Sequence, residues 1–162
     1  MDKTGTIVGS SEETLPNIPA GASFDYFGTL GDAISGNLTG TPDKITVLQA
    51  KNAFGQAGAV EQPMLKTGEL KLTKSTEDTY TDAPLSYDLT VKVTNSTRDE
   101  VTTGVAQQVV LYDAQGHVVG GGNGSSDNVP DRLPARMSYR ETWTGIPALS
   151  KATRAVYTVW VG

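Results

Sequence analysis

The chain has 162 residues, 37% of them hydrophobic, with 18 glycines, no cysteine and a formal net charge of −5. This length fits one large domain or one and a half small ones, and the lack of cysteine excludes disulfides, thiolate metal sites and cysteine nucleophiles. The acidic balance argues against a nucleic-acid or anionic-membrane surface, which needs clustered lysine and arginine, and no apolar run approaches the roughly 20 residues of a membrane span.

The first 49 residues resemble the second half of the later sequence. The pattern D-x-x-G-x-[IV]-V-G occurs at residues 2–9 and again at residues 113–120. Two further matches follow in the same order, residues 19–24 with 134–139 and residues 45–47 with 157–159. We therefore predict that residues 1–49 are a partial repeat containing only the C-terminal half of a unit, and that residues 50–66 are a linker.

A half-unit of about three strands would have a poor core and open strand edges. Three arrangements would resolve this. The early strands lie upstream, or another chain supplies them, or residues 1–49 pack on the complete domain in some other way.

Residues 67–162 alternate apolar and polar positions, as strands with one buried face do. The clearest case is residues 86–95, where Tyr87, Leu89, Val91 and Val93 share one face. In chain order, strands are predicted at residues 69–73, 86–95, 104–113, 117–119, 137–143 and 154–161. Residues 120–131 are rich in glycine, serine and asparagine and are predicted to form a loop. Six short strands without crossover helices predict an all-β, immunoglobulin-like antiparallel β-sandwich over residues 67–162.

Several motifs of this region resemble the FxLYD-type immunoglobulin-like domains of bacterial exported proteins. Residues 89–95 match the family's V-x-V-x-N strand, and residues 109–113 match its L-Y-D signature with valine in place of phenylalanine. Arg136 replaces the glycine usual after the L-x-P element, whereas Gly21 keeps it in the first copy. The resemblance covers about residues 67–162, and more loosely residues 2–49. It implies a lipoprotein or cell-surface protein and brings no catalytic residues with it.

The resemblance also bears on the start of the chain. Tyr112 precedes Asp113 in the second copy, and Met1 precedes Asp2 in the first. We expect Met1 to be an internal methionine of a longer chain, whose preceding part would carry the early strands and any export signal or lipidation cysteine.

Polar candidates for a functional site are few. His117 is the only histidine, so no histidine-based metal cluster or catalytic triad is available, and it is expected to be exposed beside a turn. Asp127, Asn128 and Asp131 carry oxygens suited to Ca²⁺, but their spacing does not match an EF-hand, so a polar loop is the favoured interpretation. No catalytic, cofactor-binding or metal-binding residue is predicted.

Two residues of the predicted strands stand out. Glu141 falls in the apolar phase of Met137, Tyr139 and Trp143, where a charge is costly unless it is paired. Arg136 or Arg154 is the expected partner, unless a bulge turns Glu141 outward. Trp160 is expected to be partly exposed, and it is our one candidate for a binding surface because such surfaces use aromatic side chains.

These observations favour a non-enzymatic, extracytoplasmic structural or binding module of a bacterial envelope or secreted protein. Its partner would be a protein or a glycan, and neither nucleic acid nor a cofactor is expected. One alternative is an assembly protein that self-associates because strands of another chain complete its N-terminal unit. A second alternative is a carbohydrate-active enzyme with carboxylates in the loop at residues 120–131.

Overall fold

The computed structural model describes residues 1–9, 21, 23–27, 40–41, 43–44, 46, 64–76, 82–102, 104–126 and 128–161. The chain divides into two compact units, Met1–Leu15 with Gly28–Glu61, and Pro16–Phe27 with Gln62–Gly162. Residues 23–27, which we placed in the partial first unit, therefore belong to the second. Of the predicted linker only residues 64–66 are described, and Lys66 already begins a strand.

In the first unit, the start of the chain is hydrogen-bonded to residues 43 and 44. The Met1 ammonium donates to the Lys44 carbonyl at 2.8 Å, and the Met1 carbonyl accepts from the amides of Asp43 and Lys44. Val8 is buried and lies against Gly40, where an added Cβ would approach its Cγ1 to 3.1 Å. Residues 45 and 47 of the third repeat match lie outside the described residues.

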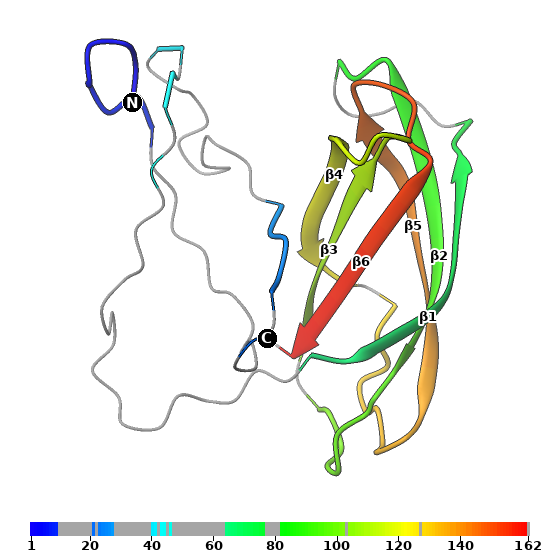
Figure 1. Ribbon diagram of the computed structural model, residues 1–162. Coiled ribbons are helices and arrows are strands. Elements are labelled where there is room, and N and C mark those ends of the chain that lie inside the picture. Colours follow the sequence, from blue (N-terminus) through cyan, green and yellow to red (C-terminus); the bar gives the residue numbers. More distant parts are fainter. Residues whose placement is uncertain are drawn as a thin grey trace, which may run out of the picture. The chain divides into compact units, whose positions relative to one another are not determined.

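The described residues of the second unit form six strands, all paired in antiparallel fashion (Figure 1). They are β1 (Lys66–Lys74), β2 (Leu85–Thr94), β3 (Val105–Tyr112), β4 (Val118–Ser125), β5 (Ser138–Ala148) and β6 (Arg154–Val161). Their order in one nearly closed sheet is β1-β2-β5-β4-β3-β6, in which Gly120 and Ala148 form the only register pair between β4 and β5. The described residues contain no helix, which confirms the all-β class.

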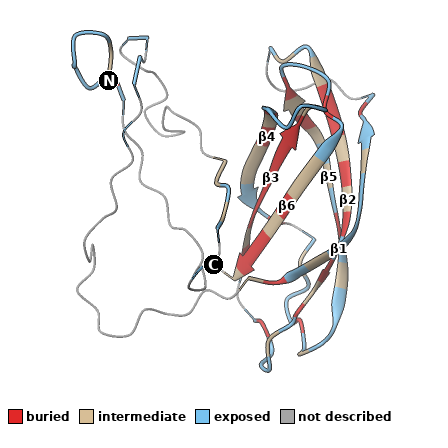
Figure 2. Ribbon diagram, viewed as in Figure 1, coloured by how far each residue is buried: buried red, intermediate tan, exposed pale blue. Residues whose placement is uncertain are grey.

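Apolar side chains from all six strands form one core. The predicted inward phase of β2 is confirmed, because its four alternating apolar residues are all buried. The same holds for the inward residues of β3 and β6, which are Val105, Val109, Leu111, Tyr157 and Val159. Burying each such side chain stabilises the fold by about 1.5–3 kcal/mol. Figure 2 shows that β3 is buried along nearly its whole length, on its outward positions as well as its inward ones.

Asn95, the asparagine of the V-x-V-x-N motif, is completely buried at the end of β2. Its Nδ2 donates to the carbonyls of Asp99 and Leu133 at 2.8 and 3.0 Å, and its Oδ1 accepts from the Thr97 amide. A buried amide is tolerated when its polar atoms are bonded in this way. The side chain therefore fastens two loops at this end of the sheet.

The region predicted as a glycine-rich loop is strand β4, so that prediction was wrong from residue 120 to residue 125. The glycines serve close packing rather than a turn. A Cβ on Gly120 would lie 2.2 Å from the Pro147 carbonyl oxygen, and one on Gly121 would lie 2.3 Å from the Val109 carbonyl oxygen. On Gly122 it would reach 3.2 Å from the Trp143 ring. Composition alone favours a loop here, but the neighbouring strands leave room only for backbone.

Strand β5 continues beyond its predicted end at residue 143 and contains a β-bulge. The register against β2 shifts between Tyr87 and Leu89, and Gly145 takes a positive φ of 69°. Its amide donates to the Asp88 carboxylate at 3.1 Å. The extra residue restores the inward phase, so Ile146 is buried in a segment that we predicted to be a connection. Met137, predicted to face the core, precedes β5 and is 56% exposed.

The two D-x-x-G sequences form turns with the same hydrogen bonds. In each turn the aspartate carboxylate accepts from the amides two and four residues later, always at 2.9 Å. The glycine lies in the left-handed region, with φ of 86° at Gly5 and 89° at Gly116, which glycine adopts without steric cost. In both copies the next apolar residue is exposed and the one after it is buried, namely Ile7 and Val8, and Val118 and Val119.

We expect Gly120→Ala to lower the free energy of unfolding by about 1–3 kcal/mol, because the new methyl group meets the backbone of β5. Gly124→Ala is the matched control, since no atom lies within 4 Å of a Cβ at that position. Urea denaturation measures both. Equal stability of the two variants would contradict the close approach of β4 to β5.

Candidate binding face

The side of β3, β4 and β6 that points away from the core forms a surface that we call the outer face. It is formed by Gln108, Val110, Tyr112, Gly121, Asn123, Arg154 and Trp160. Residues 23–27, the aromatic segment, lie against it. Trp160 is only 5% exposed, so the partial exposure that we expected is wrong. The prediction overlooked a contact between this tryptophan and a segment far away in sequence.

Gln108 holds the backbone of the aromatic segment at two points. Its Oε1 accepts from the Phe27 amide at 2.9 Å, and its Nε2 donates to the Asp25 carbonyl at 2.5 Å. A neighbouring parallel strand would bond to the same two groups, so the side chain takes the place of a strand backbone. Gln108 is completely buried, and both ends of its amide are satisfied by this one segment.

The carboxylate of Asp25 is bound by the phenol of Tyr112. The Tyr112 hydroxyl donates to Asp25 Oδ2 at 2.9 Å, and the Arg154 guanidinium lies 4.0 Å from the centre of the Tyr112 ring. Burial raises the pKa of Tyr112, the bond to Asp25 adds to the effect, and Arg154 opposes it. The phenol therefore remains a hydrogen-bond donor at neutral pH, as recognition of a carboxylate requires.

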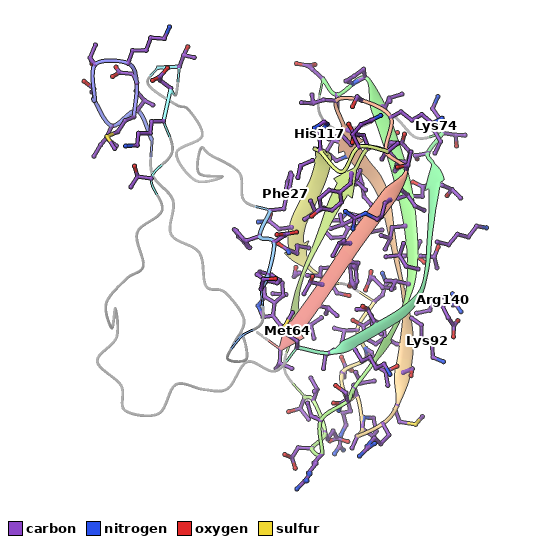
Figure 3. The ribbon with its side chains drawn as sticks, in the orientation of Figure 1. Phe27, Met64, Lys74, Lys92, His117 and Arg140 are labelled. Carbon is purple, nitrogen blue, oxygen red and sulfur yellow. The ribbon has the colours of Figure 1, made fainter. Side chains whose placement is uncertain are left out.

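Aromatic side chains complete the contact. Phe24 meets Trp160 edge to face with ring centres 5.9 Å apart, a favoured geometry worth about 0.5–1.5 kcal/mol beyond area burial. Phe27, which is labelled in Figure 3, lies over Gly121. A Cβ on this glycine would come within 2.9 Å of the Phe27 ring. The Tyr26 hydroxyl accepts from Asn123 Nδ2 at 3.2 Å. The aromatic segment is thus held through its backbone, its carboxylate and its rings.

A second polar cluster surrounds Glu141, which is only 2% exposed. Ser126 Oγ donates to one carboxylate oxygen, and Asn128 Nδ2 donates to the other at 2.7 Å. We expected Arg136 or Arg154 as the partner or an outward bulge, and both expectations were wrong. Neutral donors from the loop after β4 satisfy the inward-facing carboxylate instead.

Two tyrosines lie close to this cluster. The Tyr157 hydroxyl donates to Gln107 Oε1 at 2.6 Å, whereas the Tyr139 hydroxyl is buried and has no hydrogen-bond partner. Burial raises the pKa of Tyr139 to about 12, with Glu141 adding to the effect and Ser126 opposing it. Burial also raises the pKa of Tyr157, and Tyr139 and Glu141 add to it. The Ser126 hydroxyl that donates to Glu141 is buried together with this carboxylate.

Those of the remaining candidates that the structure describes do not form a site. The His117 side chain is 77% exposed, as predicted, and its Nδ1 lies 3.1 Å from Asp113 Oδ2. Asn128 binds Glu141, Asp131 is exposed, and Asp127 lies outside the described residues. Within the described parts of the chain, no three His, Cys, Asp or Glu side chains are grouped so as to hold a metal ion. None of those parts forms a helix long and apolar enough to cross a membrane.

Comparison with family models, curated proteins and solved structures gave no match for this chain. The resemblance to FxLYD-type domains therefore stays a prediction. Function is inferred below from the geometry of the outer face and of the Glu141 cluster.

Removal of the Tyr139 hydroxyl and removal of the Tyr157 hydroxyl should change the free energy of unfolding in opposite directions. Tyr139→Phe removes a buried donor without a partner and is expected to raise the free energy of unfolding by about 1 kcal/mol. Tyr157→Phe leaves Gln107 without a donor and is expected to lower it by about 1 kcal/mol. Chemical denaturation compares the pair, and a loss of stability in Tyr139→Phe would contradict the unbonded state of its hydroxyl.

Stability should fall in alkali. The folded pKa of Tyr139 is about 12 against an ordinary value of 10.0, so the unfolded chain releases its proton first as the pH rises. The free energy of unfolding is therefore not reduced by ionisation of this group below pH 10, and it falls between pH 10 and about 12. Urea midpoints together with tyrosinate absorbance test this expectation. Ionisation of every tyrosine near pH 10 in the folded protein would contradict it.

Proposed function

We propose that this chain is a non-catalytic binding module that recognises an extended peptide on the outer face. The observation that carries the proposal is the Gln108 amide, which is completely buried and bonded at both ends to the backbone of the aromatic segment. A side chain that binds a carbonyl and the amide two residues later recognises peptide backbone. This feature favours a protein partner over a glycan.

In this proposal the aromatic segment is the resident ligand of the outer face. Recognition has three parts: Gln108 binds the backbone, Tyr112 binds an acidic side chain, and Trp160 with Gly121 accepts flanking aromatic rings. Backbone contacts supply affinity and side-chain contacts supply selectivity, as in other domains that bind extended peptides. The preferred ligand is a short extended segment with an acidic residue between aromatic ones.

We further propose that the second unit is an immunoglobulin-like sandwich and that residues 1–49 are its partial repeat. The matching turns at Asp2 and Asp113 support the repeat, as do the positive φ values of 81° at Gly21 and 68° at Arg136. The resemblance to FxLYD-type domains supports a place outside the cytoplasm, in a bacterial envelope or secreted protein. The neutral donors around Glu141 support a structural role for that carboxylate, in keeping with a module that is not an enzyme.

A peptide of residues 19–30 tests the binding face directly. In the full-length chain, Phe24→Ala/Phe27→Ala weakens the resident segment and leaves the outer face available. The peptide should then bind and change the fluorescence of Trp160, whose indole meets Phe24. Adding Gln108→Ala removes two hydrogen bonds and should weaken peptide binding about tenfold or more.

Gln115→Ala is the matched control, because this glutamine is exposed in the turn after β3 and is not one of the residues that form the outer face. Calorimetric titration of the peptide should give the same affinity with and without it. The proposal fails if the peptide does not bind to the folded segment variant, or if Gln108→Ala and Gln115→Ala have the same effect.

A further inference from the structure

Four buried polar side chains gather on the core side of the sheet where β4 ends. Ser126, Gln107 and Glu141 are 8%, 5% and 2% exposed, and Tyr157 is 5% exposed. Ser126 Oγ donates to Glu141 Oε2, and the Tyr157 hydroxyl donates to Gln107 Oε1 at 2.6 Å. After the larger effect of burial, Glu141 contributes to the raised pKa of Tyr157, so the carboxylate lies near the phenol that binds Gln107. The proposed peptide-binding function uses none of these groups.

Gln107 and Ser126 are neighbours across the paired strands β3 and β4. Gln107 is opposite Gly124, and Ser126 lies two residues further along, on the same side of the sheet. The Ser126 amide donates to the Val105 carbonyl at 3.4 Å, so the ladder continues as far as this serine. Side chains at such diagonal positions are within reach of one another when one of them is long. Gln107 already extends in this direction, because its Nε2 donates to the Ser125 carbonyl at 3.0 Å.

The four groups supply the parts of an acyl-transfer reaction. The Ser126 hydroxyl, hydrogen-bonded to the Glu141 carboxylate, is a nucleophile beside a general base. The Gln107 carboxamide is an acyl group, and the phenol that donates to its oxygen stabilises negative charge developing there. Burial of all four groups excludes the water that would hydrolyse the product.

We propose that Ser126 and Gln107 react with each other to form an internal ester crosslink between the end of β4 and β3. Glu141 takes the proton from Ser126 Oγ, and this oxygen forms a bond to Cδ of Gln107. The Tyr157 hydroxyl stabilises the negative charge on Oε1 of the tetrahedral intermediate. The bond from Cδ to Nε2 then breaks, the nitrogen receives the proton held by Glu141, and ammonia leaves. Nothing is oxidised or reduced, and each chain reacts once without turning over a separate substrate.

The crosslink strengthens a part of the sheet that has few other connections. Among the described residues, Gly120 and Ala148 form the only register pair between β4 and β5, so the rest of β4 is paired with β3 alone. Glycine-rich strands also gain more conformational freedom on unfolding than other strands do. An ester at Ser126 fastens the end of β4 that lies farthest from this pair.

Intact mass spectrometry of the denatured full-length chain tests the proposal, because ester formation lowers the mass by that of one ammonia. The wild-type chain should show this loss after incubation in the folded state at neutral pH, whereas Ser126→Ala and Glu141→Gln should keep the full masses of their sequences. Ser125→Ala is the matched control, since this neighbouring serine is exposed, and it should lose ammonia as the wild type does. Circular dichroism establishes that each variant is folded. Gln107→Glu replaces a variant that does not fold, because it removes the leaving ammonia and keeps an oxygen that accepts from Tyr157.

A second source of ammonia has to be separated from the ester, because Asn123 precedes Gly124 and an asparagine in this position can close to a succinimide. Ser126→Ala keeps this pair, so a loss of ammonia that persists in Ser126→Ala overturns the proposal. A wild-type chain that keeps its full mass after the incubation overturns it as well. Chymotryptic cleavage after Tyr112 should leave the fragments that carry Gln107 and Ser126 joined, and hydroxylamine should separate them. Fragments that are not joined would equally contradict the crosslink.

Discussion

Strand β3 is buried on both sides, and the two adjacent glutamines at its centre need hydrogen-bond partners from neighbouring segments. Gln107 points inward, accepts from Tyr157 and donates to the Ser125 carbonyl. Gln108 points outward and is satisfied by the aromatic segment alone. A buried amide left unbonded costs about 1–3 kcal/mol, so the outer face needs an occupant with a carbonyl and an amide at the right spacing. The contact between the outer face and the aromatic segment is thus a consequence of burying β3.

The three neighbouring residues of the L-Y-D sequence have three different structural roles. Leu111 enters the core, Tyr112 reaches the aromatic segment, and Asp113 closes the turn through its own carboxylate. Alternation along a strand sends Leu111 and Tyr112 to opposite sides. At the far end of the same sheet, Asn95 and Glu141 bond loop groups in a comparable way. Polar side chains therefore fasten the loops while the apolar core holds the strands.

The sequence patterns predicted those features that depend on interactions between residues close together in the chain. The period-two alternation of β2, β3 and β6 was readable because each has one apolar face, and the Asp113 turn was readable because its hydrogen bonds lie within five residues. Strand β4 was missed because its glycines reflect close neighbours rather than backbone flexibility. The cover over Trp160 was missed because residues 23–27 reach it across a long stretch of sequence. The donors to Glu141 come from a loop whose conformation its composition does not specify.

Four of the eight residues of β4 are glycine, which gives this strand an unusual thermodynamic character. Each glycine gains more freedom than other residues on unfolding, by roughly 0.5–1 kcal/mol relative to alanine. Side chains from elsewhere, Phe27 on one side and Trp143 on the other, cover its bare backbone. Local opening of β4 and release of the aromatic segment are consequently linked, because each removes a contact from the other. The domain thereby couples the protection of its own amides against hydrogen exchange to the occupancy of its surface.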